Sequence, residues 1–447
     1  MPWQNQRMAK NKKIVILGGG PAGIGAGWRL KELDYQNWEL YEKEDFLGGL
    51  SASFKDKKGF IWDNGGHIYF SKSDYFNNVF NKIMAGDFFK KERRQFIWIE
   101  NKLIPYPFQN HIRYLEPREI FECLKGMMEV QNSKKKPKNF LEFNLMTMGK
   151  GITKYFMRPY NEKIWSWPLE DLSYKWIGSR VSVVNLEKAL ENIVFKKDEV
   201  NWGPNYYFKY PKKGGAGYFW RGFEKILKNN LNFNKEIKKI DTGNKRIYFK
   251  DNPFDNYDYL ISTLPLDFLV KNSDLGQTFK KSAQNLKYNS GMVIGVGIEG
   301  EIPESLKNKI ALYFPEKKYF FHRMINMSYF SPNNVPAGNW AIAFEISYSS
   351  KRRLGKDEIV KNIFEYLKEN KFIKNKKEII SFWLKDIEYF YPIPTLDRDK
   401  NLDKVQKELG RKNIYSVGRF GGWKYEIGNM NHSFLQGVEA VNKILSK

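Results

Sequence analysis

The sequence is poor in cysteine and histidine, with one cysteine, Cys123, and four histidines among 447 residues. A single cysteine excludes an intrachain disulfide and leaves no basis for a cysteine-based metal site, so we expect no bound metal. This composition fits a reducing compartment, and we expect a cytoplasmic protein. The N-terminal segment MPWQNQRMAKNKK lacks an apolar stretch of signal-peptide length, and no apolar run reaches 18 residues. We therefore expect neither a secretion signal nor insertion into a membrane.

Acidic residues are few relative to basic ones: 50 Asp and Glu stand against 75 Lys and Arg, for a formal charge of +25. Such a balance can indicate binding to nucleic acid or to a membrane surface, or attraction of small anions. The lysines are spread along the chain, and the densest runs, at 134–138 and 374–377, are short. No nucleic-acid-binding motif is recognisable. We therefore expect a lysine-rich surface that attracts phosphate ligands, and no nucleic-acid partner.

Apolar and aromatic residues, in contrast, are plentiful. Hydrophobic residues make up 42% and aromatic residues 16% of the chain, which predicts a folded globular protein. A chain of this length exceeds one compact core, so we expect two or three domains. Apolar runs and amphipathic periodicity predict strands at 13–17, 37–41, 257–263 and 413–417, and helices at 356–369 and 433–445.

These segments predict an α/β fold in which the two ends of the chain contribute to one nucleotide-binding sheet. The middle of the chain reads first as mainly helical and then, at 290–350, as alternating antiparallel strands. The predicted organisation is a discontinuous Rossmann-like domain with two insertions: residues 1–75, 205–275 and 400–447 form the nucleotide-binding domain, 76–204 a mainly helical substrate domain, and 276–399 a β-sheet substrate domain with a flap.

A glycine-rich loop follows the first predicted strand. Gly18, Gly20 and Gly23 form the pattern G-x-G-x-x-G between that strand and a helix. These glycines permit a tight turn, close approach of the backbone to a pyrophosphate, and close packing of helix on strand. The helix N-terminus adds free N–H donors and a positive dipole end. Glu42 lies 19 residues past Gly23, where its carboxylate can accept hydrogen bonds from a ribose diol. This arrangement predicts dinucleotide binding.

The residues after Glu42 favour FAD over NAD as that dinucleotide. Gly48 and Gly49 follow in EKEDFLGGL, a pattern that resembles flavoproteins with two dinucleotide-binding domains. Arg419 precedes the last predicted helix, whose N-terminus in this class lies beside the flavin pyrimidine, where negative charge gathers upon reduction. Asn431 or Ser433 is the expected cap of that helix.

Longer motifs make the comparison more specific. The chain resembles the UDP-galactopyranose mutase family, and within it the eukaryotic-type branch. The matching stretches run nearly from end to end: DNGGHIYFS (63–71), IPYPFQN (104–110), FMRPYNEKIW (156–165), GSRVSVVN (178–185), NWGPN (201–205), YPKKGGAG (210–217), YFYPIPTLDRD (389–399) and GRFGGWKYEIGNMNHSFLQGVEAV (418–441).

The resemblance implies a flavin-dependent isomerase. In this family FAD must be reduced, with NADPH or NADH as the reductant. The flavin N5 attacks the anomeric carbon, UDP leaves, and the sugar recloses as a five-membered ring before UDP returns, so that UDP-galactopyranose becomes UDP-galactofuranose without net redox change. The implied partner is a UDP-sugar, and the product serves galactofuranose and cell-surface glycan synthesis. The sequence is compatible with a homo-oligomer.

The resemblance also assigns roles to individual residues. A dianionic leaving group requires arginines that clamp the diphosphate, tyrosine hydroxyls that donate to it, and an aromatic ring beside the uracil. The motifs place Arg180 and Arg323 as substrate arginines, Tyr313, Tyr391 and Tyr425 on the diphosphate, Phe156, Gln109 and Asn161 on uridine, Trp165 and Asn205 near the sugar and ribose, and Arg419 and Asn429 on the flavin side.

The stretch WDNGGHIYF holds one of the few histidines, His67. Taken alone, it reads as a polar turn between two strands. With the resemblance, Gly65 and Gly66 are expected to bring the backbone flat against the isoalloxazine, with His67 near N5. An unperturbed imidazole has a pKa near neutrality, so His67 is expected to share a proton with the flavin edge and is grouped with Arg180 and Arg323 as catalytic.

Two positions depart from the family pattern. Phe330 stands where the family has another phosphate-contacting tyrosine, with Tyr329 one residue earlier, and Ala311 stands where a relative's flap has a tryptophan. Both changes leave open a variant substrate, an N-acetylated or deoxy UDP-hexose. A second alternative is an FAD-dependent amine or porphyrinogen-type oxidase, although the arginine pair argues against its apolar substrate funnel. A third is a non-enzymatic binder of nucleotide sugar or nucleic acid that retains FAD for stability.

Overall fold

A five-stranded parallel sheet gathers strands from both ends of the chain and from its middle. The computed structural model describes residues 11–131, 136–178, 185–198, 206–251 and 253–446. The sheet has the order β19-β13-β1-β2-β9, and every neighbouring pair is parallel. Its strands are β1 (Ile14–Leu17), β2 (Trp38–Tyr41), β9 (Leu231–Asn232), β13 (Tyr259–Ser262) and β19 (Ile414–Ser416). This sheet confirms the predicted Rossmann-like fold.

Alternate residues of β1 enter two separate cores, as expected for a parallel strand buried on both faces. Ile14 and Ile16 pack with α1 (Pro21–Glu32) and α15 (Met430–Leu445). Val15 and Leu17 pack with the opposite layer. That layer consists of β10 (Ile237–Asp241), β11 (Arg246–Phe249), β12 (Phe254–Asn256), α9 (Leu266–Lys271), α10 (Gln277–Gln284) and α13 (Arg398–Arg411).

A larger sheet of seven strands forms the second half of the molecule, in the order β18-β14-β17-β16-β15-β6-β7. All neighbours are antiparallel except β15 and β6. The helix α12 (Lys356–Glu369) packs on one face, with the bounds that periodicity predicts. The strands are β6 (Gln95–Ile99), β7 (Lys102–Pro105), β14 (Lys287–Glu299), β15 (Ala311–Tyr313), β16 (Arg323–Asn326), β17 (Asn339–Tyr348) and β18 (Ile379–Ile393).

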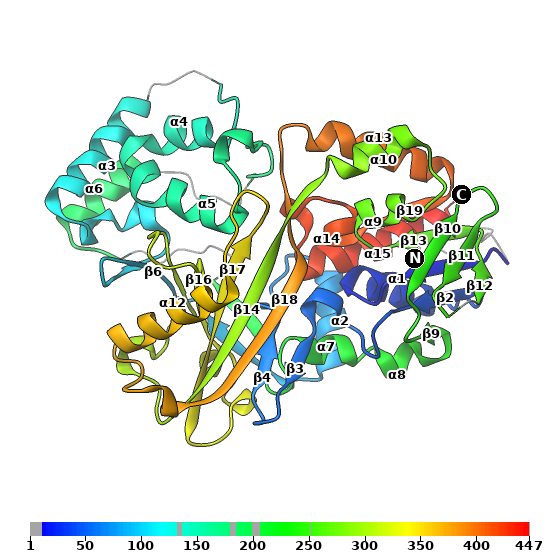
Figure 1. Cartoon of the computed structure of the whole chain (residues 1–447), viewed down its shortest axis with the longest axis horizontal. Coiled ribbons are helices and arrows are strands. Elements are labelled where there is room, and N and C mark those ends of the chain that lie inside the picture. Colours follow the sequence, from blue (N-terminus) through cyan, green and yellow to red (C-terminus); the bar gives the residue numbers. More distant parts are fainter. Residues whose placement is uncertain (1–10, 132–135, 179–184, 199–205, 252, 447) are drawn as a thin grey trace.

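The helical segment differs from its expected boundaries, because β6 and β7 fall inside it and yet belong to the seven-stranded sheet through the pairing of β6 with β15. Figure 1 shows its helices gathered on one side, with the long strands β14 and β18 between them and the Rossmann-like half. These helices are α3 (Pro117–Val130), α4 (Phe140–Ile152), a π-helical turn (Thr153–Met157), α5 (Arg158–Trp165) and α6 (Leu186–Val194).

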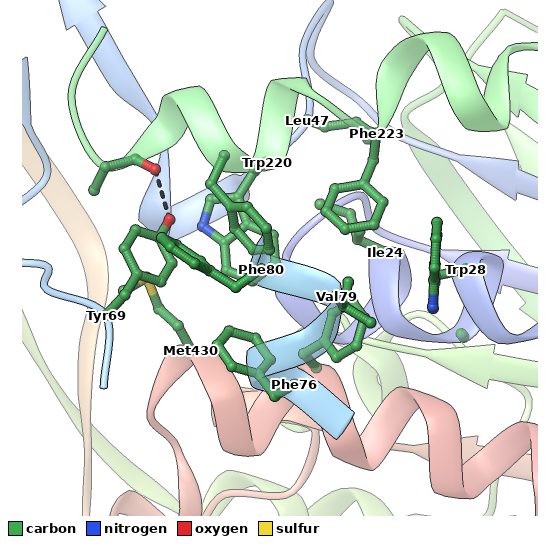
Figure 2. Packing of buried hydrophobic residues seen from close by; sticks show 14 of the residues in the cluster. Ile24, Trp28, Leu47, Tyr69, Phe76, Val79, Phe80, Trp220, Phe223 and Met430 are labelled. Carbon is green, nitrogen blue, oxygen red and sulfur yellow. Dashed lines mark hydrogen bonds between the residues drawn. The ribbon is translucent and has the colours of Figure 1, made fainter. Parts of the chain in front are cut away.

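An aromatic cluster fixes the chain directly after His67. Figure 2 shows Tyr69, Phe76, Phe80 and Trp220 packed between α1, α15 and two further helices, and the Tyr69 hydroxyl donates to the Ala216 carbonyl at 2.6 Å.

The remaining elements are β3 (Ser53–Lys55), β4 (Ile61–Asp63), α2 (Asp74–Met84), β5 (Phe88–Glu92), β8 (Tyr207–Pro211), α7 (Gly217–Arg221), α8 (Glu224–Leu227), α11 (Met327–Phe330) and α14 (Gly418–Gly421).

The last helix begins earlier than its sequence pattern predicts. Asn429 is the N-cap residue, and the Ser433 N–H donates to the Asn429 carbonyl at 2.8 Å. Asn431 and Ser433 therefore lie within the first turn, and neither is the cap. The first turn holds one apolar residue, Met430, followed by three polar ones, so apolar periodicity does not reveal it.

The contact between α1 and α15 depends on glycine. A Cβ on Gly437 would lie 1.9 Å from the Ala22 carbonyl oxygen, and a Cβ on Gly25 would lie 2.1 Å from that of Phe434. Because these neighbours are backbone atoms, they cannot move without displacing a helix. The first turn of α1 follows the glycine-rich loop, so this contact also positions that loop.

We expect Gly437→Ala to lower the free energy of unfolding by about 2–3 kcal/mol and to weaken flavin retention, because overpacking shifts α1. The matched control is Gly410→Ala in α13, where a Cβ would meet nothing within 4 Å. That change is expected to raise stability by about 0.5–1 kcal/mol through helix propensity. Urea unfolding followed by flavin fluorescence measures both. A Gly437→Ala midpoint equal to that of Gly410→Ala would contradict the prediction.

Candidate functional site

The glycine-rich loop leaves open space in front of α1. Gly18 has φ +99°, and a Cβ on Gly23 would lie 1.8 Å from the Gly18 carbonyl oxygen, so both positions require glycine. A Cβ on Gly20, the N-cap residue, would meet nothing within 4 Å, and no side chain caps the helix. The N–H groups of Ala22 and Gly23 precede the first intrahelical bond, and so they are available to an anion. The loop therefore fits a dinucleotide pyrophosphate.

Glu42 and the second glycine pair close around this loop. The Glu42 carboxylate accepts from the Gly19 N–H at 2.5 Å and from the Glu44 N–H at 2.9 Å. Burial raises its pKa, and these two bonds oppose that rise. Gly48 and Gly49 both have positive φ, and the Gly48 N–H donates to the Gly19 carbonyl at 2.8 Å. The expected contact of Glu42 with a ribose stays a prediction.

A cavity of about 1130 Å³ lies beside this region and brings most of the predicted site residues together. It is large enough for a nucleotide sugar beside a flavin ring. Its walls come from the loop after β4, the start of α15, α5, and strands β15, β16 and β18. The predicted residues that line it are Gly65, Gly66, His67, Gln109, Phe156, Asn161, Tyr313, Arg323, Tyr391, Arg419, Tyr425 and Asn429.

Apart from Glu42 and the glycines described above, three predicted residues are not among this set. Trp165 is 1% exposed and does not line the cavity; its ring packs 5.0 Å from the rings of Trp176 and Tyr425, behind the wall. It supports Tyr425 from behind, and its expected place near the sugar stays a prediction. Arg180 and Asn205 lie outside the described residues.

A buried carboxylate, Glu345 on β17, is the polar centre of the site. It is 0% exposed and accepts two hydrogen bonds of 2.7 Å from the Nε and Nη2 atoms of Arg323, its direct partner on β16. It also accepts from the Gly66 N–H at 2.7 Å, and the Nε2 atom of His322 lies 3.3 Å away. Burial raises the pKa of Glu345, but the charge of Arg323 and the bond with His322 outweigh burial and lower it to about 2. Glu345 therefore joins the loop of Gly65 and Gly66 to Arg323.

His67 is neutral in this environment. Burial and the positive charges of Arg419 and Arg323 lower its pKa to about 3, although Glu345 opposes that shift. The expectation that His67 titrates near neutrality is therefore revised. A neutral imidazole donates through one ring nitrogen and accepts through the other, so His67 can still orient a ligand. Burial likewise lowers the pKa of His322, to about 4, although its bond to Glu345 opposes that shift.

The loop that carries His67 is anchored at Asp63. This residue is 2% exposed and accepts from the Ser53 hydroxyl at 2.5 Å, the Tyr210 hydroxyl at 2.7 Å and the Ala216 N–H at 3.0 Å. Burial raises its pKa to about 6, and the hydrogen bonds oppose that rise. The Asp63 side chain thus faces away from the cavity and holds the start of the loop.

Aromatic rings form one wall of the cavity. The Phe156 ring stacks between those of Phe108 and Tyr160, each at 5.0 Å, and the Tyr160 ring meets that of Tyr313 edge-on at 5.3 Å. Burial raises the pKa of Tyr313 and of Tyr391, so both phenols remain hydrogen-bond donors at neutral pH. A flat apolar surface next to hydroxyl donors suits a nucleobase joined to a diphosphate.

Sequence reasoning missed Glu345, Arg93 and His322, which also line the cavity. The signal for Glu345 was a charge at an inward position of an alternating strand, NWAIAFEIS. His322 lies in KKYFFHRM, which offers no signal of a site on its own. Arg93 lies among polar residues in KERRQF, which offers no signal of burial. Its guanidinium lies 5.5 Å from the centre of the Phe70 ring, and burial lowers its pKa.

Within the described part of the chain, no helix is both long and apolar enough to cross a membrane. Among the same residues, no three or more His, Cys, Asp or Glu side chains are grouped to hold a metal ion.

Known proteins resemble the chain at two levels. Residues 21–445 match the model of the flavin-containing amine oxidoreductase family. A crystal structure of a reduced UDP-galactopyranose mutase is 38% identical, with a TM-score of 0.94, and the match covers 97% of this chain and 94% of that one. A putative protoporphyrinogen oxidase from Exiguobacterium sp. 255-15 has a TM-score of 0.72 over 96% of this chain and 99% of that one, but at 13% identity it shows the fold alone.

Curated relatives match over a short region only. The 15-cis-phytoene desaturase of Glycine max is 36% identical over 81 residues, so the match covers 18% of this chain and 14% of that enzyme. The long matches, in contrast, cover most of the chain, and residues 21–445 include those that line the cavity. The chain therefore belongs to the flavin-containing amine oxidoreductase family, with FAD as its cofactor, and within that family to the UDP-galactopyranose mutases.

Proposed function

We propose that the protein interconverts UDP-galactopyranose and UDP-galactofuranose without net redox change. The observation that carries the proposal is the position of Arg323 in the cavity wall. Glu345 accepts from its Nε and Nη2 atoms, and Arg323 also bonds the side chain of Tyr313, so a guanidinium and a phenol meet at one place in the cavity wall. A guanidinium fixed in this way meets a diphosphate without losing further side-chain freedom.

The surrounding residues supply the other requirements of the reaction. The phenols of Tyr313 and Tyr391 remain protonated and donate to a diphosphate, and the ring of Phe156 offers a surface to uracil. Bound reduced flavin supplies the nucleophile for the anomeric carbon. The glycine backbone at 65–66 allows close approach of the loop to a flat ring, and His67 stays neutral beside it. The chain thereby retains the departing UDP in position for its return.

An anaerobic assay tests this proposal. The FAD-loaded protein is incubated with UDP-galactofuranose, with and without dithionite, and the products are separated by chromatography. Formation of UDP-galactopyranose only in the reduced sample is the expected result, and a separate aerobic assay with candidate oxidase substrates is expected to show no oxygen consumption. Stoichiometric oxygen consumption with an amine or porphyrinogen would favour the oxidase alternative instead.

A variant UDP-hexose is a second candidate, and the wall near β15 favours it. Ala311 lines the cavity beside its strand partner Gln95, whose buried Oε1 atom has no hydrogen-bond partner among the described residues. Phe330 packs 4.8 Å from the ring of Tyr210, and the hydroxyl of Tyr329 donates to the Glu92 carbonyl, so neither supplies a phosphate donor. A small residue beside a free amide suits an extra polar substituent. Higher kcat/KM for UDP-N-acetylgalactosamine than for UDP-galactose would support this candidate, and the reverse order would reject it.

A further inference from the structure

A buried lysine connects two walls of the cavity. Lys163, on α5, is 5% exposed, and its ammonium group donates to three backbone carbonyls. The acceptors are Phe314 at 2.7 Å, Glu316 at 2.6 Å and Phe321 at 3.1 Å. All three belong to residues 314–321, the connection between β15 and β16. An ammonium has three N–H donors, so this connection satisfies it completely.

The two elements that Lys163 joins carry the predicted ligand contacts. Tyr160 and Asn161 lie on α5 and line the cavity. Tyr313 ends β15, and Arg323 begins β16, directly before and after the connection that Lys163 binds. The rings of Tyr160 and Tyr313 meet at 5.3 Å, so the two walls touch on the cavity side as well. A shift of the connection relative to α5 would therefore separate the base-binding wall from the diphosphate-binding wall.

Helix α5 is held on its other side by the large sheet. The Asn289 amide on β14 donates to the carbonyls of Ile164 and Trp165 at 2.7 and 3.1 Å, and the Ser349 hydroxyl donates to the Ser166 carbonyl at 2.5 Å. The helix is thus a fixed support. Lys163 joins this support to the β15–β16 connection. The Glu316 carbonyl also accepts from the Tyr319 N–H at 3.3 Å, whereas the buried carbonyls of Phe314 and Phe321 have no other donor among the described residues.

From this geometry we propose that Lys163 is a positioning residue for nucleotide binding. Lys163 does not touch the ligand. It sets the spacing between α5 and the β15–β16 hairpin, so that the protein binds the uridine and the diphosphate of one ligand at the same time. This inference rests on the proposed function, because a ligand with both a base and a diphosphate is what needs both walls at once. Fixed spacing lowers the ordering cost of binding.

A second cation provides a matched control. Arg352 donates to the Phe320 carbonyl at 3.0 Å and to the Ser347 carbonyl at 2.7 Å, so it binds the same connection from the side of β17. It makes no bond to α5 among the described residues. Loss of Arg352 should therefore destabilise the connection without uncoupling it from the helix.

The test compares UDP binding to Lys163→Met, Lys163→Gln and Arg352→Met with binding to the parent protein, by calorimetry on the FAD-loaded full chain. We expect the Kd for UDP to rise tenfold or more in Lys163→Met and by a smaller factor in Lys163→Gln, which keeps two N–H donors and serves where methionine impairs folding. FAD occupancy should match the parent in all variants, because the glycine-rich loop that fits the dinucleotide lies in the Rossmann-like half of the molecule, away from Lys163 and Arg352. Arg352→Met should bind UDP within about twofold of the parent.

Three outcomes have distinct meanings. An unchanged Kd in both Lys163 variants would overturn the positioning role. An equal rise in Arg352→Met would also overturn it, because general weakening of the connection would then suffice. Absence of UDP binding by the parent protein would count against the proposed function itself, and with it against this role.

Discussion

Replacing Arg323 with methionine is expected to lower kcat/KM for UDP-galactofuranose by roughly 10³-fold, which corresponds to about 4 kcal/mol of lost transition-state stabilisation. The reason is geometric. Glu345 fixes the plane of the guanidinium, and in the proposed reaction Arg323 meets the diphosphate both when UDP is bound to the sugar and when it departs. The negative charge on UDP is greatest after it departs, and the loss of Arg323 therefore affects that state most.

The variant Arg323→Lys distinguishes the effect of the positive charge at this position from the effect of the guanidinium's shape. Lysine keeps the positive charge opposite Glu345 but cannot occupy the carboxylate with two parallel bonds and still face the cavity. We expect a loss of roughly 10²-fold, measured in the same chromatographic assay under reducing conditions. Arg352→Met controls for the removal of a half-buried arginine from the same region. Parent-like kcat/KM in Arg323→Met, with FAD reduced, would contradict a diphosphate role.

The parts of the site that the sequence predicts are those whose residues are close together in the chain. The pattern from Gly18 to Gly23 predicts its own conformation, because glycine is needed where a side chain would clash with nearby atoms of the same unit. The structure confirms the strand, loop and helix. The motif around His67 is local in the same way. What its sequence could not give was the pKa of the imidazole, since Arg419 and Arg323 reach it from distant segments.

The parts that the sequence does not predict depend on register between distant strands. Glu345 and Arg323 are 22 residues apart and become partners only because β16 and β17 pair with that alignment. Lys163 has no local signal at all, since its three acceptors are backbone carbonyls about 150 residues away. Every residue has a backbone carbonyl, so the sequence does not indicate which carbonyls accept a hydrogen bond from Lys163. Only the fold shows this.

The second large effect is expected for Glu345→Gln. Removing this charge leaves Arg323 buried without a counter-ion and weakens the bond that holds Gly66, so we expect the free energy of unfolding to fall by about 3 kcal/mol at pH 7. Urea unfolding gives the value. The control is Glu365→Gln on α12, whose carboxylate lies 3.9 Å from Lys361 at an exposed site, and its effect should stay within about 0.5 kcal/mol.

The stability difference between the parent protein and Glu345→Gln should also depend on pH, in a direction that the pKa of Glu345 determines. Burial alone would raise the pKa of Glu345, but Arg323 and His322 hold it at about 2, below its ordinary value of 4.5. A depressed carboxyl pKa stabilises the fold fully above about pH 4.5, and this contribution is lost as the pH falls toward 2. The stability difference between parent and Glu345→Gln should therefore be constant from pH 7 to about 4.5 and narrow by about 2 kcal/mol between pH 4.5 and 3. A difference that widens on acidification would mean that Glu345 is protonated in the native protein and that Arg323 has another partner.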